Sequence, residues 1–469
     1  PAMLHAAFVR SDYAAGRIES IDTSRALSRP GVVAVYTFDD LRGTVGRTPC
    51  VARPDAGRDA EHPLLADGQV RWVGQPIAVV VAEDRYLARD AALDVAVEIS
   101  PTPAVVDPRA ALAPDAPRVY ADHADNIALH VPATGSPEVQ KLFAEADGIV
   151  RLELVNQRLA PVSMEGRAVL AHWDEGPQRL TLWTSTQVPH LVKQSVAQCL
   201  GIPEIRIRVI APEVGGGFGA KIPVYAEECL LPWISRKLRR PVKWSETRTE
   251  NLLGTTHGRG HVHEIEAAYR KNGELLALRG RVISDVGAYP SFFGASIATF
   301  TPLMMPGCYR PKAVDVEVVC VYTNTMATDA YRGAGRPEAA YSVERVMDEI
   351  AVATGLDPVE VRRRNFIPKD AFPFTTATGA IYDSGDYELA LAKALERFDY
   401  AGARERQAKA RAGGRLVGIG VATFTEICGR GPSTGASNPA PPQTTHTSVI
   451  VGQAPDAVGA DPTRQSDRS

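Results

Sequence analysis

Two glycine-rich segments constrain this chain most, because each lies between an expected β-strand and an expected α-helix. The first, residues 215–221, reads Gly-Gly-Gly-Phe-Gly-Ala-Lys and follows the alternating apolar and basic residues 205–210. The second, residues 331–338, follows the apolar run 314–322 and precedes a helical stretch in which Pro337 holds the first position. Strand, glycine turn and helix in this order predict a mixed α/β (α+β) fold.

Both segments have the composition of anion-binding loops. Glycines let the backbone approach a ligand closely, and free N–H groups at a helix start favour anions. Lys221, Arg332 and Arg336 add positive charge beside them. The first segment is not a phosphate-binding P-loop, because Ile222 and not Ser or Thr follows the lysine. Each segment alone is better explained as a tight turn, whereas the pair with its cations is explained equally well as the binding site of a large anionic cofactor.

Gln187 is a further candidate, because it stands immediately before an expected helix, 190–199, that ends at Gly201. A neutral amide at such an edge can donate a hydrogen bond to an oxygen of a ligand or metal. The alternative is that it caps the helix.

Three histidines raise the question of a metal site. His261 and His263 lie on one face of an expected strand, 261–270, which forms a hairpin with 274–284 around an Asn-Gly turn. His257 precedes them, and no third ligand is evident. We therefore expect no protein side chain to ligate a metal directly.

The length of 469 residues exceeds what one hydrophobic core supports, so several units are expected. Prolines between residues 101 and 117 mark a break, and the composition turns polar and proline-rich near residue 431. The expected organisation is a compact α/β unit at 1–110, a linker at 111–130, a larger α/β region at 131–430 and a disordered tail at 431–469.

Composition excludes several classes of protein. The net charge is −3 and the one basic cluster, 237–240, lies at the end of an expected helix, so nucleic acid is not an expected partner. Six scattered cysteines give no framework for zinc or an iron–sulfur cluster and indicate reduced thiols. No apolar run approaches the roughly 18 residues that span a bilayer, and no secretory signal opens the sequence. These features predict a cytoplasmic protein.

Several motifs occur together in the order found in one enzyme family. They are Gly74-Gln75-Pro76, Ser185-Thr186-Gln187, residues 215–221 and residues 330–336, supported by 164–167, 248–251, 362–365 and 382–387. Over residues 1 to about 430 the chain resembles the xanthine dehydrogenase and aldehyde oxidase family of molybdenum hydroxylases. Within that family it resembles the large subunits of aerobic carbon monoxide dehydrogenase. The resemblance implies an N-terminal a/b hammerhead domain followed by the first part of a molybdopterin-binding domain.

The resemblance also implies a molybdenum-molybdopterin cofactor, in bacterial relatives usually the cytosine dinucleotide. It implies that Gln187 is catalytic, through a hydrogen bond to an oxo ligand of molybdenum. The implied cofactor-binding residues are Gln187, Gly216, Gly217, Phe218, Gly219, Arg332, Gly333, Ala334 and Gly335. The family hydroxylates its substrates with water as the oxygen source, assisted by a glutamate base.

Electrons in this family leave through [2Fe-2S] clusters to FAD. Because this chain has no cysteine framework for clusters, the resemblance implies partner subunits that carry them. We expect a small iron–sulfur subunit and a medium FAD subunit, in a dimer of heterotrimers.

Departures from the family pattern narrow the expected chemistry. Members that oxidise carbon monoxide carry a cysteine for copper in the loop that Gly333, Ala334 and Gly335 fill here. Purine-oxidising members have a glutamate in place of Ile222. They also have an arginine shortly before the turn at 307–309, where this chain has Phe300 and Thr301 instead. Apolar residues do not pair with the polar edge of a purine. We therefore expect no copper, and an aldehyde or N-heteroaromatic substrate.

The resemblance stops near residue 429, and the family's catalytic glutamate belongs to a later region that the resemblance does not reach. We expect the chain to be inactive alone, with 431–469 as a frame-shifted tail. Three hypotheses remain: a large subunit completed by a second polypeptide, a non-catalytic scaffold that docks the partners, and the product of a damaged gene.

Overall fold

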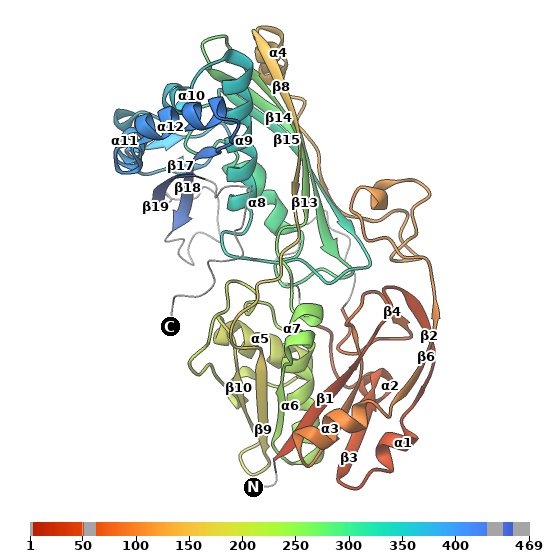
Figure 1. The fold of residues 1–469 in the computed structure, drawn as a ribbon. Helices are drawn as coiled ribbons and strands as arrows, with labels where there is room; N and C mark the ends of the chain where they lie inside the picture. The colour runs from red at the N-terminus through yellow and green to blue at the C-terminus, as the bar shows by residue number, and fades with distance from the viewer. Residues whose placement is uncertain (1–2, 49, 51–61, 429–443, 454–469) are drawn as a thin grey trace.

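The computed structural model describes residues 3–48, 50, 62–428 and 444–453, which form a mixed α/β fold built on two main sheets (Figure 1). The seven-stranded sheet has the order β11-β10-β9-β12-β1-β5-β3 and lies in the lower half of Figure 1. Helices α5 (Pro189–Leu200) and α6 (Ala226–Leu238) pack on it through buried aliphatic side chains. Its strands are β1 (Leu4–Arg10), β3 (Val32–Thr37), β5 (Pro76–Ala82), β9 (Ala168–Asp174), β10 (Arg179–Thr184), β11 (Ile207–Ile210) and β12 (Val242–Ser245).

The five-stranded sheet, with the order β7-β15-β14-β13-β8, lies in the upper half of Figure 1. Its strands are β7 (Ile127–Val131), β8 (Gly148–Asn156), β13 (His261–Tyr269), β14 (Leu275–Gly287) and β15 (Ala313–Tyr322). Helices α8 (Ser296–Met304) and α9 (Arg336–Thr354) cover one face and α4 (Pro137–Ala144) packs on the other. The antiparallel pairing of β13 with β14 confirms the expected hairpin.

Smaller elements complete the chain. A three-stranded sheet has the order β4-β2-β6, and the short strands β16 and β17 form a hairpin. The remaining elements are α1 (Ser24–Leu27), α2 (Phe38–Leu41), α3 (Arg85–Ala92), α7 (Arg248–Gly254), α10 (Pro358–Asn365), α11 (Tyr387–Phe398), α12 (Tyr400–Ala412), β2 (Gly16–Asp22), β4 (Gln69–Val70), β6 (Ala96–Pro101), β16 (Phe374–Thr375) and β17 (Ile381–Tyr382). No helix in the described part of the chain is long and apolar enough to cross a membrane.

We expected a separate first unit at 1–110, but its first strand is hydrogen-bonded to a strand of the later region. Strand β5 is buried along its whole length, as a strand covered on both faces is, and β1 lies beside it. The other edge of β1 pairs in parallel with β12, where Leu4 lies opposite Val242. Strands β1, β3 and β5 therefore share one sheet with β9–β12. Sequence patterns report burial and not the partner of an edge, which is why this pairing was not expected.

The expected linker at 111–130 is also more integrated than predicted. Strand β7 begins at Ile127, and the side chains of Ala111 and Val119 are buried in the core beneath the five-stranded sheet. Prolines interrupt the hydrogen bonding of regular structure, but they do not prevent neighbouring apolar side chains from being buried. The segment is an irregular part of the fold, and not a spacer.

The expectation of a wholly disordered tail at 431–469 is wrong for its central part. Residues Thr444–Gln453 form β19, which pairs antiparallel with β18 (Ile419–Cys428), with Ile419 opposite Gln453. Threonine and valine dominate this stretch, and both residue types favour strands. The rest of the expected tail, 431–443 and 454–469, lies outside the described residues.

Candidate functional site

The Gln187 loop and the first glycine segment lie together because of the topology of the seven-stranded sheet. Strands β10 and β11 are parallel neighbours, with Leu180 opposite Ile207, so their carboxyl ends meet at one edge. Gln187 follows β10 and residues 215–221 follow β11. Loops at the carboxyl ends of adjacent parallel strands are where α/β proteins bind ligands.

Two hydrogen bonds fix Gln187 on the first glycine segment. Its backbone N–H donates to the carbonyl of Lys221 and its Oε1 accepts from the N–H of Gly219, both at 2.9 Å. A Cβ on Gly217 would lie 2.4 Å from Oε1, so only glycine permits this approach. Because Oε1 is held as an acceptor, the Nε2 of this exposed side chain remains as a donor, and none of the described residues accepts from it.

The second glycine segment joins the first directly. The N–H of Arg332 donates to the carbonyl of Phe218 at 2.9 Å. Gly219 has a φ of +102°, and a Cβ there would lie 2.2 Å from the carbonyl oxygen of Ala330. Residues 215–219, residues 331–335 and Gln187 thus form one structure, which we call the cradle.

The cradle presents backbone donors. Within the described chain, no group accepts a hydrogen bond from the N–H of Gly217, Phe218 or Gly333. Gly335 is the N-cap of the 19-residue helix α9, and Pro337 occupies its first turn. Unpaired backbone donors beside a helix N-terminus suit an anionic group with several oxygens. The residues present therefore fit the molybdopterin cofactor that the resemblance implies.

Two cations expected to contact a ligand are instead engaged inside the protein. The Lys221 side chain is buried, and its Nζ lies 2.8 Å from a carboxylate oxygen of Glu165. Arg336 lies 2.9 Å from the carboxylate of Glu426 on β18 and also donates to the carbonyl of Gly333. Arg332 is the exposed cation of the cradle.

Sequence reasoning missed two residues that hold the cradle. Arg259 donates to the carbonyls of Tyr331 and Arg332 at 2.9 and 2.8 Å and pairs with Glu338 at 3.2 Å. The glycines on either side of Arg259 were the available signal. Glu165 contacts both the first segment and Ser185, and its signal was its place in the motif 164–167.

A buried ionic network centred on Arg167 lies at the start of strand β9 in the seven-stranded sheet. The guanidinium of Arg167 pairs with Glu227 at 3.1 Å and Glu246 at 2.8 Å, and lies 3.8 Å from the centre of the Tyr225 ring. Burial acts to raise the pKa of Glu227, but Arg167 and Arg10 outweigh it and lower this pKa to about 2. Burial raises the pKa of the neighbouring Glu228 to about 7, although the hydroxyl of Thr184 donates to it.

The three histidines do not converge. His263 Nδ1 lies 2.6 Å from the hydroxyl of Ser342, and its other ring nitrogen lies 3.4 Å from His261. Burial lowers the pKa of both imidazoles, that of His261 to about 3, so they are neutral interior groups. His257 instead places Nε2 3.0 Å from the carbonyl of Leu252.

The residues at the family's variable positions lie in two different places. Phe300 borders the second glycine segment, since a Cβ on Gly335 would lie 2.8 Å from its Cβ, and Thr301 donates to the Gly335 carbonyl. Ile222 packs against the core of the seven-stranded sheet.

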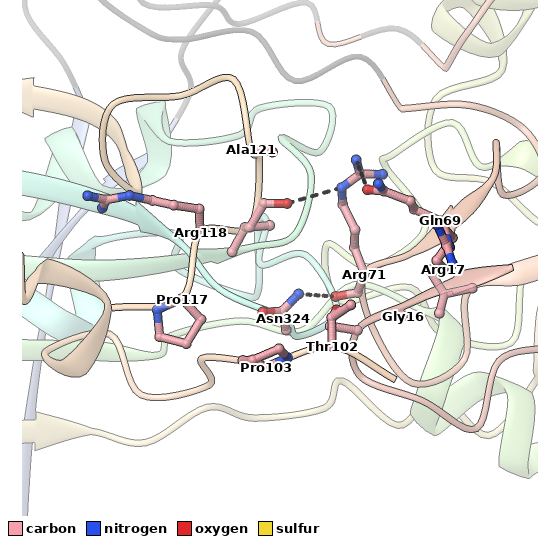
Figure 2. Close-up of a pocket in the computed structure, with 13 residues that line it drawn as sticks. Gly16, Arg17, Gln69, Arg71, Thr102, Pro103, Pro117, Arg118, Ala121 and Asn324 are labelled. Carbon is pink, nitrogen blue, oxygen red and sulfur yellow. Dashed lines mark hydrogen bonds between the residues drawn. The ribbon is translucent and has the colours of Figure 1, made fainter. Parts of the chain in front are cut away.

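A separate cavity of about 290 Å³ lies between the three-stranded sheet and residues 102–121 (Figure 2). It contains no predicted site residue. Arg71 crosses it, donating to Gln69 Oε1 at 2.8 Å and to the Val119 carbonyl at 3.3 Å, and Asn324 donates to the Arg71 carbonyl. These bonds join the cavity walls to each other, so the cavity marks a structural junction.

An α/β chain whose glycine loops and glutamine amide form such a cradle is, by class, a protein that binds a large anionic cofactor. Residues 119–366, more than half of the chain, match the molybdopterin cofactor-binding domain family. Residues 1–103 match the a/b hammerhead domain of aldehyde oxidase and xanthine dehydrogenase. The chain belongs to this family of molybdenum hydroxylase large subunits, which confirms the resemblance seen in the sequence.

Individual relatives agree with this assignment. The chain is 37% identical over 456 residues to the carbon monoxide dehydrogenase large chain of Hydrogenophaga pseudoflava, covering 92% of this chain and 56% of that one. It is 34% identical to the nicotine 6-hydroxylase large subunit of Paenarthrobacter nicotinovorans, covering 92% and 53%. The solved structure of quinoline 2-oxidoreductase from Pseudomonas putida 86 superposes with a TM-score of 0.88 at 37% identity, covering 92% and 55%. The chain thus spans about half the length of these relatives.

Proposed function

We propose that this chain forms one side of the molybdopterin site of an enzyme that hydroxylates an aldehyde or N-heteroaromatic substrate with the oxygen of water. The cradle is the observation that carries the proposal. When bound, the cofactor supplies a metal centre that accepts the electrons of the oxidation. The Nε2 of Gln187 and the N–H groups of Gly217, Phe218 and Gly333 would hold the cofactor by donating to its oxygens, because none of them is engaged within the described chain.

The proposed cofactor is the cytosine dinucleotide form of molybdopterin, without copper. Support for the absence of copper comes from residues 331–336, which contain no thiol. Copper(I) prefers soft sulfur ligands, and Gly333, Ala334 and Gly335 offer none. The relation to carbon monoxide dehydrogenase therefore does not extend to carbon monoxide as the substrate of this chain.

The choice of substrate rests on the surroundings of the second glycine segment. Phe300 borders this segment, in the region where the resemblance implies an arginine in purine-oxidising members. The guanidinium of Arg336 lies 5.5 Å from the centre of the Phe300 ring. An aromatic ring favours a flat apolar substrate over a purine whose polar edge needs partners. The names of two relatives, which act on nicotine and quinoline, point in the same direction.

The other side of the site is proposed to come from residues that this chain does not include. The cradle is open on one face, since Phe218 is 45% exposed and nearby Met164 is 92% exposed. The base glutamate belongs to that missing side. A small iron–sulfur subunit and a medium FAD subunit are the proposed electron partners, consistent with relatives named as large chains or large subunits.

The test is expression of this chain together with a polypeptide that supplies the rest of the large subunit and with the partner subunits. We expect molybdenum without copper by elemental analysis, release of a cytosine nucleotide on acid hydrolysis, and turnover of quinoline or an aldehyde with incorporation of labelled oxygen from water. Stoichiometric copper with oxidation of carbon monoxide would overturn the substrate proposal. A folded assembly without molybdenum would favour the non-catalytic scaffold.

A further inference from the structure

An ion pair between the buried Lys221 and the half-buried Glu165 lies beside the first glycine segment. Lys221 is 3% exposed, and its Nζ donates to the carbonyl of Glu165 at 2.9 Å and to the Oε2 of the same residue at 2.8 Å. Among the residues that the structure describes, Glu165 is the one carboxylate within ion-pair distance of Lys221. A buried ammonium group deprived of its partner is strongly unfavourable, so this pairing is enforced once the chain folds.

The Glu165 carboxylate also connects two further segments. Its Oε2 accepts from the N–H of Gly215 at 2.7 Å and from the hydroxyl of Ser185 at 2.9 Å. A Cβ on Gly215 would lie 2.6 Å from the Cβ of Glu165, so the close approach requires glycine. One oxygen atom therefore gathers donors from the β10–α5 loop and from both ends of the first glycine segment.

Lys221 acts on Gln187 through its backbone. Its carbonyl accepts from the N–H of Gln187 at 2.9 Å and from the Thr186 hydroxyl at 3.1 Å, while the Gln187 side chain bonds to Gly219. The side chain of Lys221 is thus tied to Glu165 and its main chain to Gln187. Any movement of Lys221 is transmitted to the amide that faces the ligand.

We propose that the Glu165–Lys221 pair is the positioning element that sets the orientation of the Gln187 amide, and that it contributes no donor to the ligand itself. This inference rests on the proposed function only for what the amide contacts. The geometry of the pair is independent of any cofactor. The Glu165 carboxylate bonds to the N–H of Gly215, and the Lys221 side chain is buried.

The first test measures amide hydrogen exchange in the chain itself, without reference to cofactor. Glu165→Gln keeps the size of the side chain but removes its charge, and Lys221→Met keeps the aliphatic stem. Each single variant should speed exchange at 184–188 and 215–221 by about tenfold or more, because local opening loses its main restraint. The double variant Glu165→Gln/Lys221→Met leaves no unpaired buried charge, so it keeps the test valid if a single variant fails to fold. Unchanged exchange in both segments of the double variant would overturn the proposal.

A matched control is available on the surface. Lys369 lies 2.8 Å from Asp386 and is 75% exposed, so Lys369→Met breaks an ion pair of the same length and chemistry far from the cradle. It should leave exchange at both segments as in the unmodified chain. An equal change in the control would show that the effect is general, and not a property of the pair.

The second test uses the complete enzyme and separates positioning from simple destabilisation. Glu165→Gln should lower kcat by about tenfold with little change in KM, and adding Gln187→Ala should lower it little further, because groups that act as a unit are not additive. Fully additive losses would overturn the proposal. If the unmodified enzyme proves to hold no molybdenum, the proposed function fails, while the exchange measurement still decides the role of the pair.

Discussion

The two ends of the Gln187 side-chain amide have different roles: the oxygen bonds to the protein and the NH2 group is left as a donor for a ligand. The N–H of Gly219 occupies the oxygen at 2.9 Å, which turns the NH2 group outward from the first glycine segment. In the complete enzyme, Gln187→Ala should lower kcat by about ten- to a hundredfold, the equivalent of one hydrogen bond to a charged acceptor, with molybdenum retained. Gln187→Glu keeps the acceptor for Gly219 but has no donor, so it should lose as much. Loss of the cofactor in either variant would show that Gln187 is structural.

Glu227 predicts how the fold responds to acid. Its pKa of about 2 lies below the ordinary value of 4.5, so the stability that its charge contributes is present above pH 4.5 and is lost as the pH falls toward 2. The shift corresponds to roughly 3 kcal/mol in the free energy of unfolding. Glu227→Gln should be less stable than the unmodified chain at pH 7, and urea titrations should show the difference in unfolding free energy closing as the pH falls from 4.5 toward 2. The exposed α12 residue Glu405, changed to Gln, serves as the control; a gap that stays constant with pH would contradict the assignment.

At the scale of elements, the strand–glycine–helix units were predictable because their signals are local. The hairpin of β13 and β14 has its turn residues at 271–273, and α9 begins at Arg336 because Pro337 suits a first helical turn. Two other features were not predictable, because they depend on contacts with distant parts of the chain. The pairing of β1 with β12 joins residues more than 200 positions apart, and a strand in the polar stretch that contains β19 depends on the presence of β18.

The candidate site shows the same division. Gln187 and the glycine segments stand out in the sequence, whereas the ion pair of Lys221 with Glu165 and the contacts of Arg259 become visible only when the loops are placed together. A charged residue beside a glycine loop faces either the ligand or the protein, and the sequence does not distinguish these cases. Lys221 and Arg336 face the protein.

Gly219 offers a direct test of the contact between the two glycine segments. At φ +102°, Gly219→Ala is strained, and its Cβ would meet the Ala330 carbonyl at 2.2 Å, so the segments must separate and the cradle should lose its cofactor. The control is Gly414→Ala, which has a φ of +83° but nothing within 4 Å, and it should cost only the strain of about 1 kcal/mol. Molybdenum content and melting temperature, both measured in the complete enzyme, separate the loss of the cofactor from the loss of stability. Full molybdenum content in Gly219→Ala would show that the segments need not touch.

At the scale of the whole molecule, the cradle belongs to neither main sheet alone. Its first segment leaves the seven-stranded sheet after β11, and its second lies between β15 of the five-stranded sheet and α9. Isolated bridges join the connecting chains where the two halves meet, at Leu159 with Gly258 and at His257 with Thr328. The relative placement of the sheets therefore fixes the cradle, and a ligand bound there would contact loops from both halves of the fold.

This arrangement leads to a prediction for the 469-residue chain expressed alone. Gln187, Phe218 and Arg332 are all exposed, so the cradle surrounds a ligand from one side and leaves the opposite side to water. Water competes for the anionic oxygens of such a ligand, and a site with half its contacts binds far more weakly. We expect the isolated chain to retain no molybdenum after desalting and to oxidise neither aldehydes nor quinoline. The same chain combined with a polypeptide that supplies the rest of the large subunit is the control and should retain the metal. Stoichiometric molybdenum together with turnover by the isolated chain would show that this half of the site is sufficient, and that the base for the reaction lies among its own residues.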